Sequence, residues 1–262
     1  MIIRKSEAEL AKMAHAGAVV QGCLELLSGA VRPGITTEEL DAMAEKYIIS
    51  KGGVPTFKGY HGFPGSICAS PNDMVVHGIP GQLKLKEGDI LGVDVGVTMD
   101  GFIGDAAMTF PVGKISEEAE RLLRVTEESL KRGIAQCKVG NRIGDISHAV
   151  QTYVESNGFS VVQSMVGHGV GREMHEDPQV PNYGPAHQGP ELREGMVIAI
   201  EPMVNVGGFE VEAGDDGWAI LTRDGSLSAH FEHTVAITKD GPRILTAARA
   251  GGEGSTLTGE RN

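Results

Sequence analysis

Three segments of the sequence alternate like β-strands but carry a carboxylate opposite their bulky apolar face. Small residues neighbour each acid on its own face, so space is left above it: Gly92 and Gly96 for Asp94, Ala199 for Glu201, and Thr234 and Ala236 for Glu232. The segments are 90–97 with Asp94, 197–204 with Glu201, and 231–237 with Glu232. A carboxylate on a largely buried strand is costly unless it is paired or bound to a metal. The pattern therefore constrains the chain to a sheet built around a polar centre.

A fourth acid is brought to this centre by a hairpin. Asp100-Gly101 predicts a tight turn between strands over 89–97 and 102–110. Asp94 and Asp105 lie at nearly equal distances from the turn, so we expect them to stand opposite each other within one residue of register. Two carboxylates that close raise each other's pKa, and a divalent cation removes the conflict.

A histidine completes the candidate ligand set. The glycine-rich segment GHGVGREMHEDP contains His168 and His175. Four carboxylates with one imidazole suit hard or borderline divalent metals, and four negative charges balance two such ions. This composition favours a dinuclear site in which a bridging hydroxide attacks a carbonyl that the metals polarise. Five other histidines are interpreted as surface, structural or packing residues: His15, His148, His187, His230 and His233.

Each residue has a structural explanation when taken alone. A single strand acid is more often an edge residue, an Asp near a turn is usually turn chemistry, and a lone histidine is more often hydrogen-bonded than a ligand. The joint pattern favours a site.

The remaining patterning predicts one α+β domain over residues 1–246. Capping boxes at Ser6/Glu9 and Thr36/Glu39 begin two helices. Further elements are helices over about 116–137 and 145–156 and strands over 196–206, 231–237 and 243–246. The segment 247–262 is rich in Gly, Ser and Thr and is predicted to be a flexible tail.

Composition restricts the partners and the compartment. The formal net charge of the 262-residue chain is -12, which weighs against nucleic acid. The three cysteines form no CxxC pair, the N-terminus lacks an apolar signal core, and no apolar run reaches about 20 residues. We therefore expect a cytoplasmic protein without membrane insertion. Because no feature demands a partner, we expect a monomer.

Five motifs in order resemble the type I methionine aminopeptidases, from about residue 3 to residue 246. They are VVHGIPG, VDVGVTMDGFIGDAAMTF, GHGVGREMHEDP, AIEPMV and FEHTVAIT. The resemblance is to the bacterial short form, without an N-terminal zinc-finger extension or the type II insert. It implies a pita-bread fold, with a curved antiparallel sheet, two pseudo-symmetric halves and outer helices. It also implies removal of the initiator methionine from nascent proteins when the next residue is small, with transient ribosome association.

The resemblance assigns roles to individual residues. It implies the metal ligands Asp94, Asp105, His168, Glu201 and Glu232, with Asp105 and Glu232 bridging two ions of Co, Mn, Fe or Zn. Glu201 would also be the general base, His175 would stabilise the tetrahedral intermediate, and His77 would contact the peptide beyond the scissile bond. The implied methionine pocket is formed by Tyr60, His61, Phe63, Cys68 and Trp218. Phe57 stands where the family often has cysteine, at the pocket mouth.

Two other functions are compatible with these motifs. The proline dipeptidases and aminopeptidase P share the fold and the ligands, but they usually carry a separate N-terminal domain. A non-catalytic binding protein on the same fold would typically lose ligands, whereas all five are present here.

Overall fold

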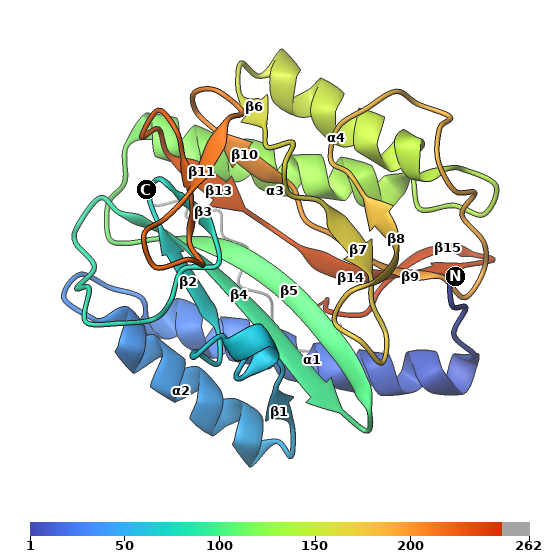
Figure 1. The fold of residues 1–262 in the computed structure, drawn as a ribbon, viewed down its shortest axis with the longest axis horizontal. Helices are drawn as coiled ribbons and strands as arrows, with labels where there is room; N and C mark the ends of the chain where they lie inside the picture. Colours follow the sequence, from blue (N-terminus) through green and yellow to red (C-terminus); the bar gives the residue numbers. More distant parts are fainter. Residues whose placement is uncertain (248–262) are drawn as a thin grey trace, which may run out of the picture.

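The computed structural model describes residues 1–247, in which helices and antiparallel strands form two similar groups (Figure 1). One group contains α1 (Glu7–Ala30) and α2 (Thr37–Ser50), and the other contains α3 (Glu117–Ala135) and α4 (Ile143–Ser156). The predicted capping boxes at the starts of α1 and α2 are confirmed. A short 3-10 helix, η1, covers Tyr60–Gly62.

The strands form two main sheets and two small ones. In the first main sheet the order is β1-β4-β2, with β5 paired to β4, and in the second it is β15-β14-β9-β7-β8. The small sheets have the orders β13-β10-β6 and β11-β12-β3. The bounds are β1 Val54–Pro55, β2 Cys68–Pro71, β3 Met74–Val76, β4 Ile90–Met99, β5 Phe102–Pro111, β6 Ser160–Val161, β7 Gly167–Gly169, β8 Glu176–Val180, β9 Val197–Ile200, β10 Met203–Asn205, β11 Val211–Ala213, β12 Ile220–Thr222, β13 Ser228–His230, β14 His233–Thr238 and β15 Gly241–Ile244.

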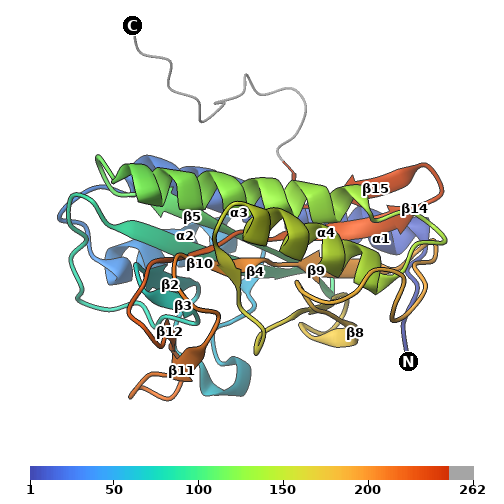
Figure 2. The ribbon, with the colours of Figure 1, turned by 90° about the horizontal axis from the view of Figure 1, so that it is seen from above.

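The helices cover one side of the strands. Figure 2 shows α1, α3 and α4 as a layer, with β11, β12 and β8 extending from the opposite side. Glycine permits the close approach of α1, since a Cβ at Gly104 would lie 2.6 Å from the backbone nitrogen of Gly17. The apolar faces predicted for the strands are buried against these helices, and the acid faces are turned the other way.

Two predicted strands are interrupted where the acids lie. The strand predicted over 196–206 is split into β9 and β10, with Glu201 and Pro202 between them. Proline has no N–H to donate to a ladder, so it ends the pairing of β9. The strand predicted over 231–237 begins only at His233, which leaves Glu232 between β13 and β14. Glu201 and Glu232 therefore lie at breaks between sheets and not within regular strands.

Two threonines join the halves of the molecule beside these breaks. The Thr234 hydroxyl donates to the carbonyl of Asp105 at 2.7 Å and accepts the Asp105 N–H at 3.1 Å. The Thr109 hydroxyl donates to the carbonyl of His230 at 2.8 Å. The backbone N–H of Glu232 also donates to the carbonyl of Ala107 at 2.9 Å. These bonds hold β5 against the segment that carries Glu232.

The turn between β4 and β5 is confirmed, but the expected register is wrong. Asp100 and Gly101 both have positive φ, 52° and 75°, as a tight hairpin turn requires. Asp94 pairs with Ala107 and Asp105 pairs with Gly96, so the two acids lie two positions apart along the ladder. A shift of two keeps both side chains on one face, because side-chain direction alternates with a period of two residues.

Two remaining expectations concern the C-terminal tail and membrane insertion. The predicted tail, 247–262, lies outside the described residues except for Ala247. Among residues 1–247, every helix is too short or too polar to cross a lipid bilayer.

Candidate metal and substrate site

Three side chains from different elements converge at the centre of the sheets. Ligand atoms of Asp105 on β5, His168 on β7 and Glu232 before β14 all lie within 4.8 Å of one another. All three residues are buried. They approach from three parts of the sequence because the Thr234 bonds hold β5 to β14, while β9 pairs with both β7 and β14.

Glu201 and Asp94 extend this cluster. Glu201 Oε1 lies 3.5 Å from His168 Nε2, and Asp105 Oδ2 lies 3.8 Å from the same nitrogen. Burial raises the pKa of the Asp94, Asp105, Glu201 and Glu232 carboxyl groups well above its usual range, and repulsion between neighbouring acids raises it further. The four acids are therefore one electrostatically coupled group.

The acids present oxygen atoms with no protein partner. Within residues 1–247, the buried oxygens Asp94 Oδ1, Asp105 Oδ1 and Glu232 Oε1 accept no hydrogen bond. Buried polar atoms are normally satisfied, and carboxylate oxygens directed at one another are the donor set of a divalent cation. The residues present thus fit the metal ions that the sequence predicts.

His168 is oriented as a ligand. Its Nδ1 lies 2.9 Å from the carbonyl oxygen of Gly169, so Nδ1 carries the proton and the lone pair of Nε2 points into the acid cluster, where a cation could accept it. Burial lowers the pKa of His168 to about 4, which keeps the imidazole neutral near pH 7.

Two further predicted histidines lie beside the cluster. The ring of His175 packs edge-on against that of His168, with centroids 4.4 Å apart. Tyr60 Oη lies 2.8 Å from His175 Nδ1. His77 is held at a positive φ of 62°, and burial together with the nearby His175 lowers its pKa. Tyr60, His77 and His175 lie on separate segments of the sequence, and the fold brings them close to one another beside His168.

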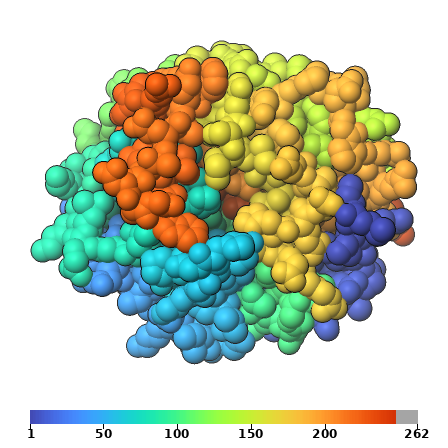
Figure 3. All heavy atoms as spheres, in the orientation of Figure 1, coloured from blue at the N-terminus to red at the C-terminus, as the bar shows by residue number. Residues whose placement is uncertain are grey.

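The residues of the predicted methionine pocket also meet here. Phe63 packs edge-on against Trp218, with ring centroids 5.1 Å apart, and Tyr60 packs against His61 at 4.3 Å. Cys68 pairs with Asp94 between β2 and β4, so it lies directly beside the acids. His61 itself is exposed. Figure 3 shows this face hollowed near its centre, between the cyan, orange and yellow segments.

Phe57, the departure from the family pattern, is buried in one cluster with the pocket residues Phe63, Cys68, Tyr60 and Trp218. A Cβ on Gly96 would lie 2.6 Å from Phe57 Cε1, so the ring rests directly on the β4 backbone. Gly96 pairs with Asp105, which places Phe57 next to the strand position that carries an acid.

His230, interpreted from the sequence as surface or structural, is buried beside the acid cluster. Its side chain is 4% exposed, and its Nε2 lies 3.8 Å from Glu201 Oε2. Nε2 has no hydrogen-bond partner among residues 1–247. The sequence signal was its position two residues before Glu232, on the same strand face. In contrast, His15, His148 and His187 are exposed, as expected, and His233 binds Thr246 through Nδ1 at 2.9 Å.

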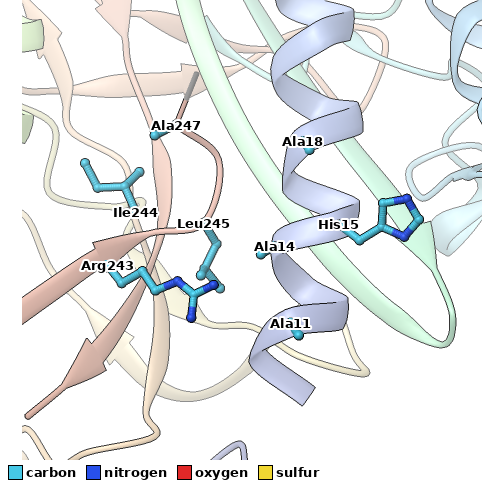
Figure 4. Close-up of a pocket in the computed structure, with 8 residues that line it drawn as sticks. All are labelled: Ala11, Ala14, His15, Ala18, Arg243, Ile244, Leu245 and Ala247. Carbon is cyan, nitrogen blue, oxygen red and sulfur yellow. The ribbon is translucent and has the colours of Figure 1, made fainter. Parts of the chain in front are cut away.

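A separate surface pocket lies between α1 and the end of β15 (Figure 4). Alanines on α1 leave room there, and Arg243 extends toward the helix from the other wall. Its lining is Ala11, Ala14, His15, Ala18, Arg243, Ile244, Leu245 and Ala247, which includes none of the predicted site residues.

Comparison with known proteins places this geometry in a family. The model of metallopeptidase family M24 matches residues 11–239. The chain belongs to metallopeptidase family M24. It is 56% identical to a methionine aminopeptidase of Clostridium perfringens, over 94% of this chain and 99% of the relative. It is 54% identical to methionine aminopeptidase 1 of Bacillus subtilis, with the same coverage. The resemblance to the short bacterial methionine aminopeptidases is therefore confirmed.

Solved structures of M24 proteins agree with this assignment. A methionine aminopeptidase from Rickettsia prowazekii superposes with a TM-score of 0.93 at 41% identity, covering 94% of this chain and all of the other. A prolidase from Pyrococcus furiosus superposes with a TM-score of 0.75 at 20% identity, which shows the shared fold alone. The predicted α+β pita-bread fold is confirmed, with its two pseudo-symmetric halves and outer helices (Figure 1).

Proposed function

We propose that this M24 metallopeptidase is a methionine aminopeptidase that removes the initiator methionine from nascent proteins when the next residue is small. The observation that carries the proposal is the convergence of Asp105, His168 and Glu232 within 4.8 Å, in a chain 56% identical to a methionine aminopeptidase. The ligand set supports hydrolysis, and the relatives support methionine as the residue removed.

Two divalent ions would be held by the five residues of the cluster: Asp94, Asp105, His168, Glu201 and Glu232. Their unpaired oxygens and the oriented His168 support this assignment. When bound, such ions polarise the scissile carbonyl and lower the pKa of water. Oxygen-rich ligation of this kind admits Co, Mn, Fe or Zn.

Glu201 would accept the proton of the attacking water. A carboxylate beside the attacking water can take its proton, and Glu201 Oε1 lies in the cluster, 3.5 Å from His168 Nε2. The carbonyl oxygen of Glu201 accepts the side-chain N–H of Asn182 at 3.0 Å, which holds the acid at the end of β9. His230 faces its other oxygen.

His175 would donate a hydrogen bond from its Nε2–H to the oxygen that becomes negative in the tetrahedral intermediate. When the Tyr60 hydroxyl donates to Nδ1, the single N–H of the neutral imidazole is on Nε2, which is the tautomer this role needs. His77, on the same side, would contact the peptide beyond the scissile bond.

The methionine side chain would occupy the pocket formed by Tyr60, His61, Phe63, Cys68 and Trp218. An unbranched thioether packs well against aromatic edges and faces. The edge-on pair of Phe63 and Trp218 offers such a surface, and Cys68 links it to the acids.

The wider setting is also part of the proposal. Residues 1–246 would act as one catalytic domain, and the protein would work as a cytoplasmic monomer that visits the ribosome transiently. The three cysteines are all free and buried, in keeping with a reducing compartment.

Peptide hydrolysis tests the function. We expect the metal-loaded protein to release methionine from Met-Ala-Ser and to leave Ala-Pro peptides intact. Preference for Ala-Pro would instead assign it to the proline-directed relatives, and inactivity of a protein with measured full metal content would favour a binding role.

A further inference from the structure

A buried ion pair joins the N-terminal segment to the loop that carries His175. Lys5 Nζ lies 2.6 Å from Glu176 Oε2, and the two side chains are only 3% and 7% exposed. Lysine and glutamate are seldom buried to this degree unless they are paired, and breaking such a pair leaves an uncompensated charge. The pair therefore fixes the position of whatever is attached to its two ends.

Glu176 closes the loop before it into a compact turn. Its Oε1 accepts the backbone N–H of Arg172 at 2.9 Å and that of Glu173 at 3.4 Å. Gly171 leaves the space for this arrangement, because a Cβ there would lie 2.5 Å from Glu176 Oε1 and 2.8 Å from Lys5 Nζ. One carboxylate thus holds both ends of the segment 172–176.

Lys5 is itself anchored to the second main sheet. Its backbone N–H donates to the carbonyl of Gly195 at 2.6 Å, and the Gly195 N–H donates to Ile237 on β14 at 2.9 Å. The neighbouring Arg4 Nε donates to the carbonyl of Glu194 at 2.6 Å. The backbone of Lys5 is therefore tied, through Gly195, to β14, the strand that directly follows Glu232.

His175 directly precedes Glu176, which leads to the inference. We propose that Lys5 is a positioning residue for His175: through Glu176 it holds the imidazole against His168, with Tyr60 at its other nitrogen. The inference rests on the proposed function for the role of His175, but the positioning itself is a property of the loop. It gives the first five residues of the chain a part in the site.

The test uses Lys5→Met, which keeps the length and apolar stem of lysine and removes its charge. The matched control is Lys131→Met, which breaks the exposed 2.8 Å pair with Glu127 on α3. In the metal-loaded protein we expect Lys5→Met to lower kcat about tenfold or more, with KM changed less than about twofold, since displaced catalytic groups cost rate more than affinity. Lys131→Met leaves both constants unchanged.

Binding separates positioning from general damage to the fold. We expect Lys5→Met to bind free methionine as the wild type does, and to bind a phosphonate analogue of the tetrahedral intermediate more weakly by the factor lost in kcat/KM. Glu176→Gln should behave like Lys5→Met, and the double variant should be no worse than either single one. An unchanged kcat, or equal losses for methionine and the phosphonate, overturns the inference.

A readout that needs no substrate keeps the inference separate from the proposed function. The ring signals of His175 can be assigned in NMR spectra from their absence in His175→Asn. We expect them to shift or broaden in Lys5→Met and to stay in place in Lys131→Met. Unchanged signals would reject the positioning role even if the protein cleaves methionyl peptides. Shifted signals would support it even if the wild type does not.

Discussion

The Tyr60 hydroxyl and His175 Nδ1 lie 2.8 Å apart, although the two residues are 115 positions apart in the sequence. Their rings are tilted by 38° with centroids 5.7 Å apart, so the two residues meet through this polar contact and the rings do not stack. We propose two roles for Tyr60: its ring lines the proposed pocket, and its hydroxyl, by donating to Nδ1, would keep the His175 N–H on Nε2.

Replacing Tyr60 with phenylalanine removes the hydroxyl and keeps the aromatic ring. We expect Tyr60→Phe to lower kcat about tenfold, because His175 loses its fixed tautomer and orientation, while KM changes little since the aromatic wall remains. Steady-state kinetics on Met-Ala-Ser measures this, with Tyr153→Phe on α4 as the control. A change confined to KM would show that the hydroxyl serves substrate binding instead.

His175→Ala should lower kcat more than it raises KM. A hydrogen bond donated to the oxyanion is stronger in the transition state than in the ground state. The loss of one such donor typically costs about 100-fold or more in rate. If Tyr60 acts through His175, adding Tyr60→Phe to His175→Ala should cost nothing further. Additive losses in the double variant would contradict that link.

Glu201→Ala should abolish turnover while leaving the fold intact. The variant loses both a proposed ligand and the proposed base, and a general base alone contributes about a hundredfold to ten-thousandfold. The metal-free variant should melt no lower than the wild type, because one of four mutually repelling buried acids is gone. Near-normal kcat with added metal would refute the assignment, and circular dichroism checks the fold.

Gly96→Ala tests the contact between the β4 backbone and the Phe57 ring. The added Cβ would meet the Phe57 ring at 2.6 Å, and overpacking a buried contact typically costs about 1 to 3 kcal/mol. Phe57→Cys should relieve the clash, so the double variant should melt above Gly96→Ala alone. We also expect Gly96→Ala to weaken metal binding, since Gly96 pairs with Asp105; equal melting of the single and double variants would count against this packing.

Sequence alone predicted the four long helices and the long strands, because periodicity and caps act locally, but it did not predict short strands such as β2, β7 and β8. The boxes at Ser6 and Thr36 and the Asp100-Gly101 turn each fix an element through bonds within a few residues. The breaks at Pro202 and before His233 were missed, since strand-like alternation continues through both. They depend on which strand lies alongside, and that is a property of the assembled sheets.

The residues of the candidate site also differ in whether the sequence alone reveals them. The acids were visible because a carboxylate is out of place on a strand face. His230 was not, because an imidazole is common in both buried and exposed positions. Its place two residues before Glu232 is a weak signal, and its 3.8 Å approach to Glu201 appears only in the fold. Lys5 was equally hidden: its partner is 171 residues away, and nothing in MIIRKSEAEL marks a lysine as buried.

The pH dependence of the metal-free protein combines two opposite effects. The pKa of Asp94, Asp105, Glu201 and Glu232 is raised in the folded state, so their contribution to stability is present in acid and is lost as the pH rises from about 4 through the raised values. The pKa of His168 is lowered to about 4, so its contribution is present above about pH 6.5 and is lost as the pH falls.

These pKa shifts predict how the stabilisation by an added metal ion depends on pH. A divalent ion binds the four acids as carboxylates and His168 as neutral imidazole, so binding releases the protons that the folded protein retains. The rise in Tm on adding Mn²⁺, relative to EDTA, should therefore grow from about pH 5.5 to about pH 7.5. Asp105→Asn removes a central ligand and should flatten the trend, while Lys131→Met should preserve it. A rise in Tm that is the same at every pH would mean that the added ion binds elsewhere, because no group of this cluster would then be losing a proton to it.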